Sequence, residues 1–371
     1  MKVKPNIPLS QVEKTGTVQH WGFFSKEEIA QATADGSLLM LDIDFGRTCS
    51  LRCPWCFRRR NKVDMGGMLD MEYGQLISVL AQARDLGLRS VKICGAGEPF
   101  ENPRLLELTR DLTRMDIGLA IFTKGHVIGD DGWSRRVFGM DGVAVCDELH
   151  KLKTSVMLSY PSFDPQLFCR LVGDKTGEHA ARVKLAAERL AAAGFNSETP
   201  TRLAFVHAPI VQVSIGGAFE VYQFARERNI LPVLAFSMVS GEQITGGFLA
   251  RHDPTTEEKL SLFRAVYQFN LDRGIQTKGQ LLDGWVSCMP GIHPCNQIAV
   301  GLYLTANGNV VRCPGDSGAP LGNVQREKIA DIWTQARQWQ FSGRFNCGCP
   351  YKDGRTIPWK IYEEIEKIIK S

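Results

Sequence analysis

The chain has 371 residues, enough for one large domain and a smaller one with a substantial hydrophobic core. With 44% hydrophobic and 23% charged residues it has the composition of an ordinary soluble globular protein, and its net charge of +4 does not indicate a nucleic-acid partner. The N-terminus has no apolar stretch of signal-peptide length, and no run of about 18 apolar residues occurs, so we expect a cytoplasmic protein without membrane spans. Eleven cysteines in such a protein indicate metal ligands or reactive thiols more than disulfides.

Six apolar runs alternate with amphipathic segments over the first two thirds of the chain. The runs predict β-strands at residues 38–46, 90–97, 118–125, 154–160, 201–210 and 231–238. The segments between them predict helices, with Asp70 as the N-cap of the first and Gly194 at the end of a later one. Six strand–helix units predict a parallel α/β sheet covered by helices, either curled into a barrel or open and doubly wound.

The sequence changes character on both sides of this unit. Residues 1–37 lack clear periodicity and are expected to form an extension packed on the main domain. Glycine, proline and cysteine become more frequent beyond residue 275, and five of the eleven cysteines lie between residues 288 and 349. We therefore expect an N-terminal extension, a main domain, a linker helix and a small C-terminal domain, at residues 1–37, 38–245, 246–274 and 275–371.

Three cysteines follow the first predicted strand, in the stretch CSLRCPWCF. A parallel βα domain carries its chemistry on loops at the carboxyl ends of its strands, so Cys49, Cys53 and Cys56 are expected on that face. Thiolates suit zinc or an iron–sulfur cluster, and three of them would leave one iron of a four-iron cluster open to another molecule. A zinc knuckle or three unrelated core cysteines are the structural alternatives.

The spacing C-x3-C-x2-C, with an aromatic residue before the third cysteine, resembles that of the radical S-adenosylmethionine (SAM) family. The resemblance implies a partial (β/α)6 TIM-like barrel in which Cys49, Cys53 and Cys56 hold a [4Fe-4S] cluster whose open iron binds SAM. One electron from the cluster would cleave SAM to methionine and a 5′-deoxyadenosyl radical, which takes a hydrogen atom from the substrate. Trp55 would pack near the adenine.

Later segments resemble the SAM-binding stretches of the same family. GAGEP is similar to the family's Gly-Gly-Glu-Pro stretch, with Ala96 in place of the second glycine. The residues that the resemblance places at the amino group of SAM are Gly95, Gly97, Glu98 and Pro99. Lys124 replaces the asparagine of the family's third-strand Thr-Asn-Gly, and Ser159 lies where relatives offer a hydroxyl to the ribose or the methionine carboxylate. By themselves these segments read as an ordinary turn and a strand-end hydroxyl.

A second set of cysteines lies near the C-terminus. Residues 302–313, LYLTANGNVVRC, predict a hairpin that turns at Asn307-Gly308 and brings Cys313 back toward Cys295. This spacing resembles the SPASM and twitch extensions of the radical SAM family and implies one auxiliary [4Fe-4S] cluster in a small C-terminal iron–sulfur domain. The expected ligands are Cys295, Cys313, Cys347 and Cys349, with Cys288 in reserve. A zinc site with the same ligands is the alternative.

Other polar and sulfur-containing residues are open to two readings. Cys94, Cys146 and Cys169 lie in apolar patterns and read as core residues, although a thiol could also quench a substrate radical in an epimerase. The arginine run 58–60 reads as a solvated surface, or as a holder for a phosphate or carboxylate on the substrate.

Three classes of function follow. The first is an oxidoreductase, epimerase or lyase acting on a small polar molecule such as a sugar, aminocyclitol or nucleoside. It is favoured because fewer than 40 residues precede the first strand, whereas many peptide maturases carry a leader-binding domain. The second is a peptide maturase that forms crosslinks or oxidises residues, and the third is a non-enzymatic electron carrier. We expect a flavodoxin- or ferredoxin-type reductant, and the second cluster favours oxidation of the substrate.

Overall fold

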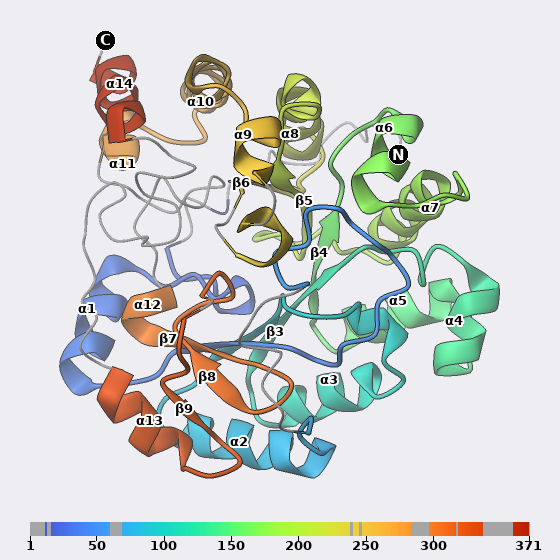
Figure 1. The fold of residues 1–371 in the computed structure, drawn as a ribbon, viewed down its shortest axis with the longest axis vertical. Helices are drawn as coiled ribbons and strands as arrows, with labels where there is room; N and C mark the ends of the chain where they lie inside the picture. Colours follow the sequence, from blue (N-terminus) through green and yellow to red (C-terminus); the bar gives the residue numbers. More distant parts are fainter. Residues whose placement is uncertain are drawn as a thin grey trace.

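The computed structural model describes residues 12, 16–59, 69–237, 240–244, 247–282, 297–316, 318–336 and 359–370. A curved sheet lies at the centre of the molecule, and helices cover its outer side (Figure 1). None of the described helices is both long and apolar enough to cross a membrane.

Six parallel strands form the centre of the sheet. They are β1 (Met40–Ile43), β2 (Ser90–Ile93), β3 (Gly118–Thr123), β4 (Ser155–Ser159), β5 (Leu203–Ile210) and β6 (Leu231–Phe236). From β1 to β6, consecutive strands of the chain pair with one another. A doubly wound sheet reverses its strand order at a switch point, whereas strands that pair in chain order form the wall of a barrel. The six predicted strands and the partial barrel are therefore confirmed, and the open doubly wound sheet is excluded.

Seven helices lie between these strands. They are α2 (Tyr73–Asp85), α3 (Leu105–Arg114), α4 (Asp131–Phe138), α5 (Gly142–Lys151), α6 (Pro165–Val172), α7 (His179–Ala192) and α8 (Ala218–Arg226). Alternate strand residues such as Ile43, Ile93 and Leu158 pack with these helices in the main hydrophobic core. Because neighbouring residues of a strand point to opposite faces, the residues between them face the barrel lumen.

The first of these helices begins later than the sequence indicated. α2 has Glu72 as its N-cap, and the Glu72 N–H donates to the side chain of Gln75 at 2.8 Å. The prediction that Asp70 caps this helix is therefore wrong. The carboxylate of Asp70 instead pairs with Arg47, at 2.7 Å, on the loop that follows β1.

The N-terminal segment closes the amino-terminal end of the barrel. The short helix η2 (Gln19–Trp21) places Trp21 against the lumen-facing residues of β3, β5 and β6, and the indole Nε1 donates to the carbonyl of Thr201 at 2.8 Å. Helix α1 (Lys26–Asp35) follows, with a capping box between Ser25 and Glu28. The sequence analysis missed this helix, although Ser25 and Glu28 have the spacing of a capping box.

The C-terminal part extends the same sheet beyond β1. β7 (Gly301–Leu304) pairs in parallel with β1 and antiparallel with β8 (Asn309–Val311), and β9 (Gly322–Asn323) adds the last edge. The predicted hairpin is confirmed, and Gly308 takes a φ of +80°, which favours glycine. The remaining helices are α9 (Phe248–His252), α10 (Thr256–Asp272), α11 (Lys278–Leu282), α12 (Gln297–Val300), α13 (Ile329–Ala336) and α14 (Trp359–Lys370). The hairpin that leads to Cys313 thus belongs to the sheet that carries the first three cysteines.

Replacing Trp21 with alanine tests the closing role of the N-terminal segment. A buried Trp→Ala change costs about 3–5 kcal/mol, so we expect the free energy of unfolding to fall by that amount in a urea titration followed by circular dichroism. The control is Leu69→Ala, at a side chain that is 87% exposed, with an expected change within about 0.5 kcal/mol. Equal unfolding midpoints for the two variants would contradict this role.

Candidate active site

The three clustered cysteines lie on the loop after β1, half-buried and free of disulfides. Burial, together with the negative charges of Glu98 and Cys53, raises the pKa of Cys49 to about 12. Burial also raises the pKa of Cys53; Lys124 opposes this shift and Cys56 adds to it. The three thiols therefore lie within electrostatic reach of one another, and as thiolates they need a positive partner such as iron.

The spacing of these thiols bears on the kind of metal group they fit. Among the described residues, no three cysteine, histidine or carboxylate side chains lie close enough together to hold a single metal ion. A four-iron cluster binds each thiolate through a different iron, so its ligands lie further apart than those of one ion. Three thiolates on one loop are donors that such a cluster can take.

Hydrogen bonds to a carboxylate fix the start of this loop. The backbone N–H of Ser50 donates to both carboxylate oxygens of Glu101, at 2.9 and 3.1 Å, and the His126 ring lies 3.0 Å from the same carboxylate. Burial raises the pKa of Glu101, but hydrogen bonds from His126 and Ser50 outweigh it and lower the pKa below its usual value. The sequence analysis missed Glu101 and His126, because the contact joins three loops whose approach no local spacing predicts.

The two glycines of GAGEP lie where a side chain would collide with the site. A Cβ on Gly95 would strike the carboxylate of Asp44 and the hydroxyl of Tyr303. A Cβ on Gly97, which has a φ of +80°, would lie 2.9 Å from the carbonyl oxygen of Gly46. The loop can therefore pack on the cysteine loop only with glycine at both positions.

Glu98 joins the GAGEP loop to the end of β3. Its carboxylate accepts hydrogen bonds from the Thr123 hydroxyl at 2.5 Å and from the Lys124 N–H at 2.7 Å. Its own N–H donates to the Thr48 carbonyl at 2.7 Å, next to Cys49. The side chain is buried, and Pro99 is buried beside it at the start of the 3-10 helix η4 (Pro99–Glu101). Glu98 thus joins the GAGEP loop to the end of β3 and to the start of the cysteine loop. These segments form the rim at the carboxyl end of the barrel.

The other predicted SAM-binding residues lie on the same rim. Lys124 Nζ donates to the Ser159 hydroxyl at 3.0 Å, at the carboxyl ends of β3 and β4. The Trp55 ring packs edge-on against Phe248 and His252 of α9, with ring centres 6.3 and 6.0 Å apart. The structure therefore brings the cysteine loop, the GAGEP loop, Lys124 and Ser159 to one end of the barrel.

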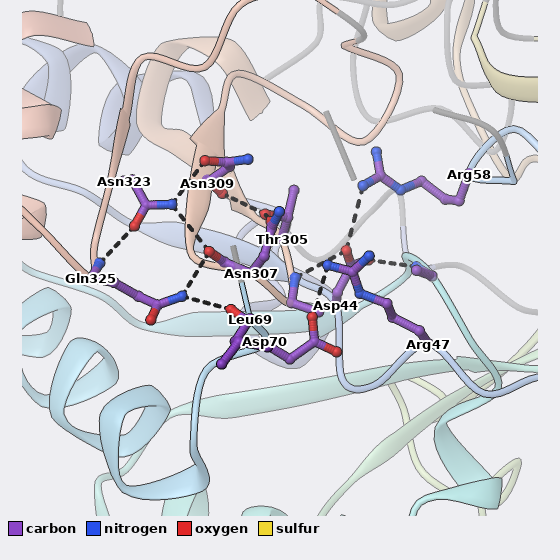
Figure 2. Close-up of polar contacts among 12 residues, drawn as sticks. Asp44, Arg47, Arg58, Leu69, Asp70, Thr305, Asn307, Asn309, Asn323 and Gln325 are labelled. Carbon is purple, nitrogen blue, oxygen red and sulfur yellow. Dashed lines mark hydrogen bonds and ion pairs between the residues drawn. The ribbon is translucent and has the colours of Figure 1, made fainter. Parts of the chain in front are cut away.

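Arg58 does not lie on a solvated surface. Only 3% of the residue is exposed, its guanidinium donates to the Pro314 carbonyl at 3.1 Å, and it pairs with Asp44 at 3.4 Å (Figure 2). It also lies over the Tyr303 ring, 4.6 Å from the ring centre. The interpretation of a solvated surface is therefore wrong for Arg58, because strand β7 and the chain after Cys313 cover it.

The hairpin turn is clamped against the barrel (Figure 2). The Gln325 amide donates to the carbonyls of Leu69 and Asn307, both at 2.9 Å, and the Asn323 amide donates to the Asn307 carbonyl at 3.1 Å. On the barrel side, Asp44 accepts a hydrogen bond from the Ala306 N–H at 3.2 Å. These contacts hold the turn of the C-terminal hairpin against the loops that follow β1 and precede α2.

Of the second cysteine set, the structure describes one member. Cys313 follows β8, half-buried, and the next residue, Pro314, accepts the hydrogen bond from Arg58. The other expected ligands lie outside the described residues: Cys288, Cys295, Cys347 and Cys349.

Two sequence families match this chain. The Radical SAM superfamily matches residues 43–207, and the SPASM iron-sulfur cluster-binding domain matches residues 295–350. The two matches together cover more than half of the chain. The chain belongs to the radical SAM superfamily and carries a SPASM domain. Its cofactors are therefore SAM, the [4Fe-4S] cluster that binds it, and an auxiliary [4Fe-4S] cluster.

Individual relatives of this radical SAM protein are distant. It is 28% identical over 92 residues to the tungsten-containing aldehyde ferredoxin oxidoreductase cofactor-modifying protein of Pyrococcus furiosus. That match spans 24% of this chain and about a quarter, 25%, of the relative.

Two solved structures share the fold of this protein. Streptococcus suis SuiB bound to its precursor peptide SuiA has a TM-score of 0.58 at 17% identity, over 83% of this chain and 68% of that one. The enzyme anSMEcpe with bound SAM has a TM-score of 0.55 at 17% identity, over 80% of each chain. At this identity the likeness shows a common fold.

The variant Gly95→Ala tests the close packing of the site. Because the new Cβ would strike Asp44 and Tyr303, we expect the purified protein to bind less iron and to melt at a lower temperature. The matched control is Gly74→Ala in α2, where nothing lies within 4 Å of the added Cβ. Full iron content together with an unchanged melting temperature in Gly95→Ala would contradict the packing described here.

Proposed function

We propose that Cys49, Cys53 and Cys56 ligate the SAM-binding cluster and that the enzyme takes a hydrogen atom from a small polar substrate held in the barrel lumen. The observation that carries this proposal is the shared rim. The cysteine loop, the GAGEP loop and the ends of β3 and β4 are joined there by hydrogen bonds of Glu98 and Lys124. When bound, the cluster and SAM supply a 5′-deoxyadenosyl radical at this rim.

Residues of the rim have distinct parts in binding SAM. The tight backbone at Gly95 and Gly97 lets the cofactor's amino group approach the GAGEP loop, with Glu98 and Pro99 fixing that loop. Lys124 Nζ and the Ser159 hydroxyl, 3.0 Å apart, suit the methionine carboxylate, because an ammonium and a hydroxyl both donate to it. Trp55 borders the adenine.

The side chains that line the lumen favour a small polar substrate. Its wall on β1 and β2 carries Asp42 and Lys92, whereas its wall on β3 and β4 carries Phe122 and Met157. A sugar, aminocyclitol or nucleoside combines polar groups with an apolar ring face and would fit both walls. Peptide maturation is the second candidate function, because SuiB, which has the same fold, is solved with its precursor peptide bound.

The C-terminal residues complete the proposal. Cys295, Cys313, Cys347 and Cys349 ligate the auxiliary cluster within a SPASM domain at 275–371, behind a linker at 246–274. A ferredoxin- or flavodoxin-type protein supplies the electrons. The described cysteines are free thiols, which suits a reducing cytoplasmic location.

Cofactor cleavage gives the direct test of the first cluster. Reduced by dithionite, the wild-type protein is expected to convert SAM to 5′-deoxyadenosine and methionine, and Cys53→Ala to lose this activity. The matched control is Cys146→Ala, at a buried thiol of helix α5 in the outer core, which is expected to keep it. Cleavage of SAM by a well-folded Cys53→Ala protein would overturn the assignment.

The variant Cys313→Ala tests the second cluster. The wild-type protein is expected to hold about eight iron atoms, four in each cluster, and Cys313→Ala to lose roughly half of them. Cleavage of SAM is expected to persist, since the first cluster is held by another loop. A folded Cys313→Ala protein with full iron content would remove Cys313 from the ligand set.

A further inference from the structure

The lumen holds a group of polar residues that the binding of SAM does not use. Asp42 on β1 lies beside Lys92 on β2, with Nζ 3.6 Å from Oδ1, and the thiol of Cys94 donates to Oδ2 at 3.3 Å. The side chains of Val91 and Ile93 pack in the outer core, so Lys92 and Cys94 face the lumen. Asp42, Lys92 and Cys94 are called the lumen triad below.

One atom of the lumen triad, Asp42 Oδ1, has an ion-pair partner in Lys92 but no hydrogen-bond donor in the described part of the chain. Asp42 is only 4% exposed, yet its Oδ1 accepts no hydrogen bond there, because Lys92 is too distant to donate one. Leaving a buried carboxylate oxygen without a hydrogen-bond donor is unfavourable. Such an atom in a barrel lumen indicates a place where a bound molecule or water completes the hydrogen bonds.

Solvent reaches the lumen around the triad. Lys92, Phe122 and Met157 lie in the middle of the sheet, yet each is partly exposed, which requires free space on the lumen side. The floor is closed beneath Lys92, since a Cβ on Gly22 would lie 3.6 Å from its Cε. The opposite end is the rim that carries the cysteine loop.

Cys94 is the cysteine best placed to meet a radical formed at that rim. It directly precedes Gly95 of the GAGEP loop and lies against Tyr303 in the lumen. Cys146, in contrast, is buried in the outer core among the helices. Cys94 lies at the carboxyl end of β2, next to the rim, whereas Cys146 does not. Cys94 is therefore the better candidate for a thiol that reacts with a radical.

We propose that Cys94 donates a hydrogen atom to a carbon radical in the lumen and that Asp42 and Lys92 restore its proton. This proposal rests on the proposed function above and narrows it. A substrate radical that regains a hydrogen atom from the protein on the face opposite to the one that lost it leaves as an epimer, so the reaction is an epimerisation of a polar substrate and not its oxidation.

The donation balances in two steps. The substrate carbon radical takes the hydrogen atom, so the Cys94 S–H bond breaks, a C–H bond forms and a thiyl radical remains. One electron from the ferredoxin- or flavodoxin-type reductant and one proton passed from Lys92 through Asp42 then regenerate the thiol. Lys92, with 19% of its side chain exposed, exchanges protons with water.

Electrostatics keep the donor in its hydrogen-bearing form. Burial raises the pKa of Cys94 well above its usual value; the charge of Asp42 raises it further, Lys92 opposes this, and Asp44 adds to the increase. The buried Tyr303 hydroxyl, which donates to Asp44, also lies beside it. A thiol in this environment is a poor nucleophile, but it keeps the hydrogen atom that a carbon radical can take.

Transfer of deuterium from Cys94 to 5′-deoxyadenosine tests the hydrogen donor, and this test needs no known substrate. The holoenzyme is reduced with dithionite in D2O with SAM as the only organic probe and no added thiol, and 5′-deoxyadenosine is analysed by mass spectrometry. The wild-type and Cys146→Ala proteins are expected to give deuterated 5′-deoxyadenosine, because the exchanged S–D of Cys94 quenches the radical. The deuterated fraction is expected to be lost in Cys94→Ala.

Each result of this experiment decides the proposal. An unlabelled wild-type product, an undiminished deuterated fraction in Cys94→Ala, or its loss in Cys146→Ala would overturn the donor role while leaving cleavage of SAM intact. A wild-type holoenzyme that forms no 5′-deoxyadenosine would instead overturn the proposed function, and this inference with it.

A second measurement tests the lumen triad without catalysis. Alkylation of Cys94 in the holoenzyme by iodoacetamide at fixed pH is followed by peptide mass spectrometry, and its rate reports the thiolate fraction. Asp42→Asn is expected to speed the reaction, because it removes a negative charge, and Lys92→Met to slow it. A merely structural role would move both rates in the same direction, and that outcome or two unchanged rates would overturn the coupling.

Discussion

The carboxylate of Asp44 is the point at which the parts of this molecule meet. It follows β1 and accepts hydrogen bonds from the Tyr303 hydroxyl, from the N–H groups of Ala96 and Ala306, and from the guanidinium of Arg58. These donors come from strand β7, the GAGEP loop, the C-terminal hairpin turn and the cysteine loop. Removing one partner of a buried ion pair costs about 3–5 kcal/mol, so this one side chain ties four segments into a single site.

This arrangement explains how two cluster-bearing segments far apart in the chain are held together. β7 pairs with β1 along its full length, and the turn after it is fixed by Gln325, so the chain around Cys313 keeps a constant position against the cysteine loop. The same strand, through Tyr303, borders the lumen next to Cys94. The C-terminal hairpin therefore shapes the lumen side of the barrel in addition to leading to Cys313.

Much of the fold could be predicted from the sequence, because strands, most helices and the hairpin depend on local patterns. Contacts between segments far apart in the sequence could not be predicted in this way. Arg58 read as solvated because it lies in a run of three arginines, whereas its burial is set by Tyr303 and Pro314, more than 240 residues later. The contact of Glu101 with Ser50 and the place of Cys94 beside Asp42 likewise depend on strand register, which the sequence does not contain as a local signal.

The central claim is that the loop after β1 holds a cluster with one iron open to SAM. Electron–nuclear double resonance tests it most directly, on the reduced holoenzyme with SAM labelled with 15N in its amino group. The account predicts a hyperfine coupling between the label and the reduced cluster, present in the wild-type protein and absent in Cys53→Ala. A reduced cluster in the wild-type protein that shows no coupling to bound, labelled SAM would contradict it.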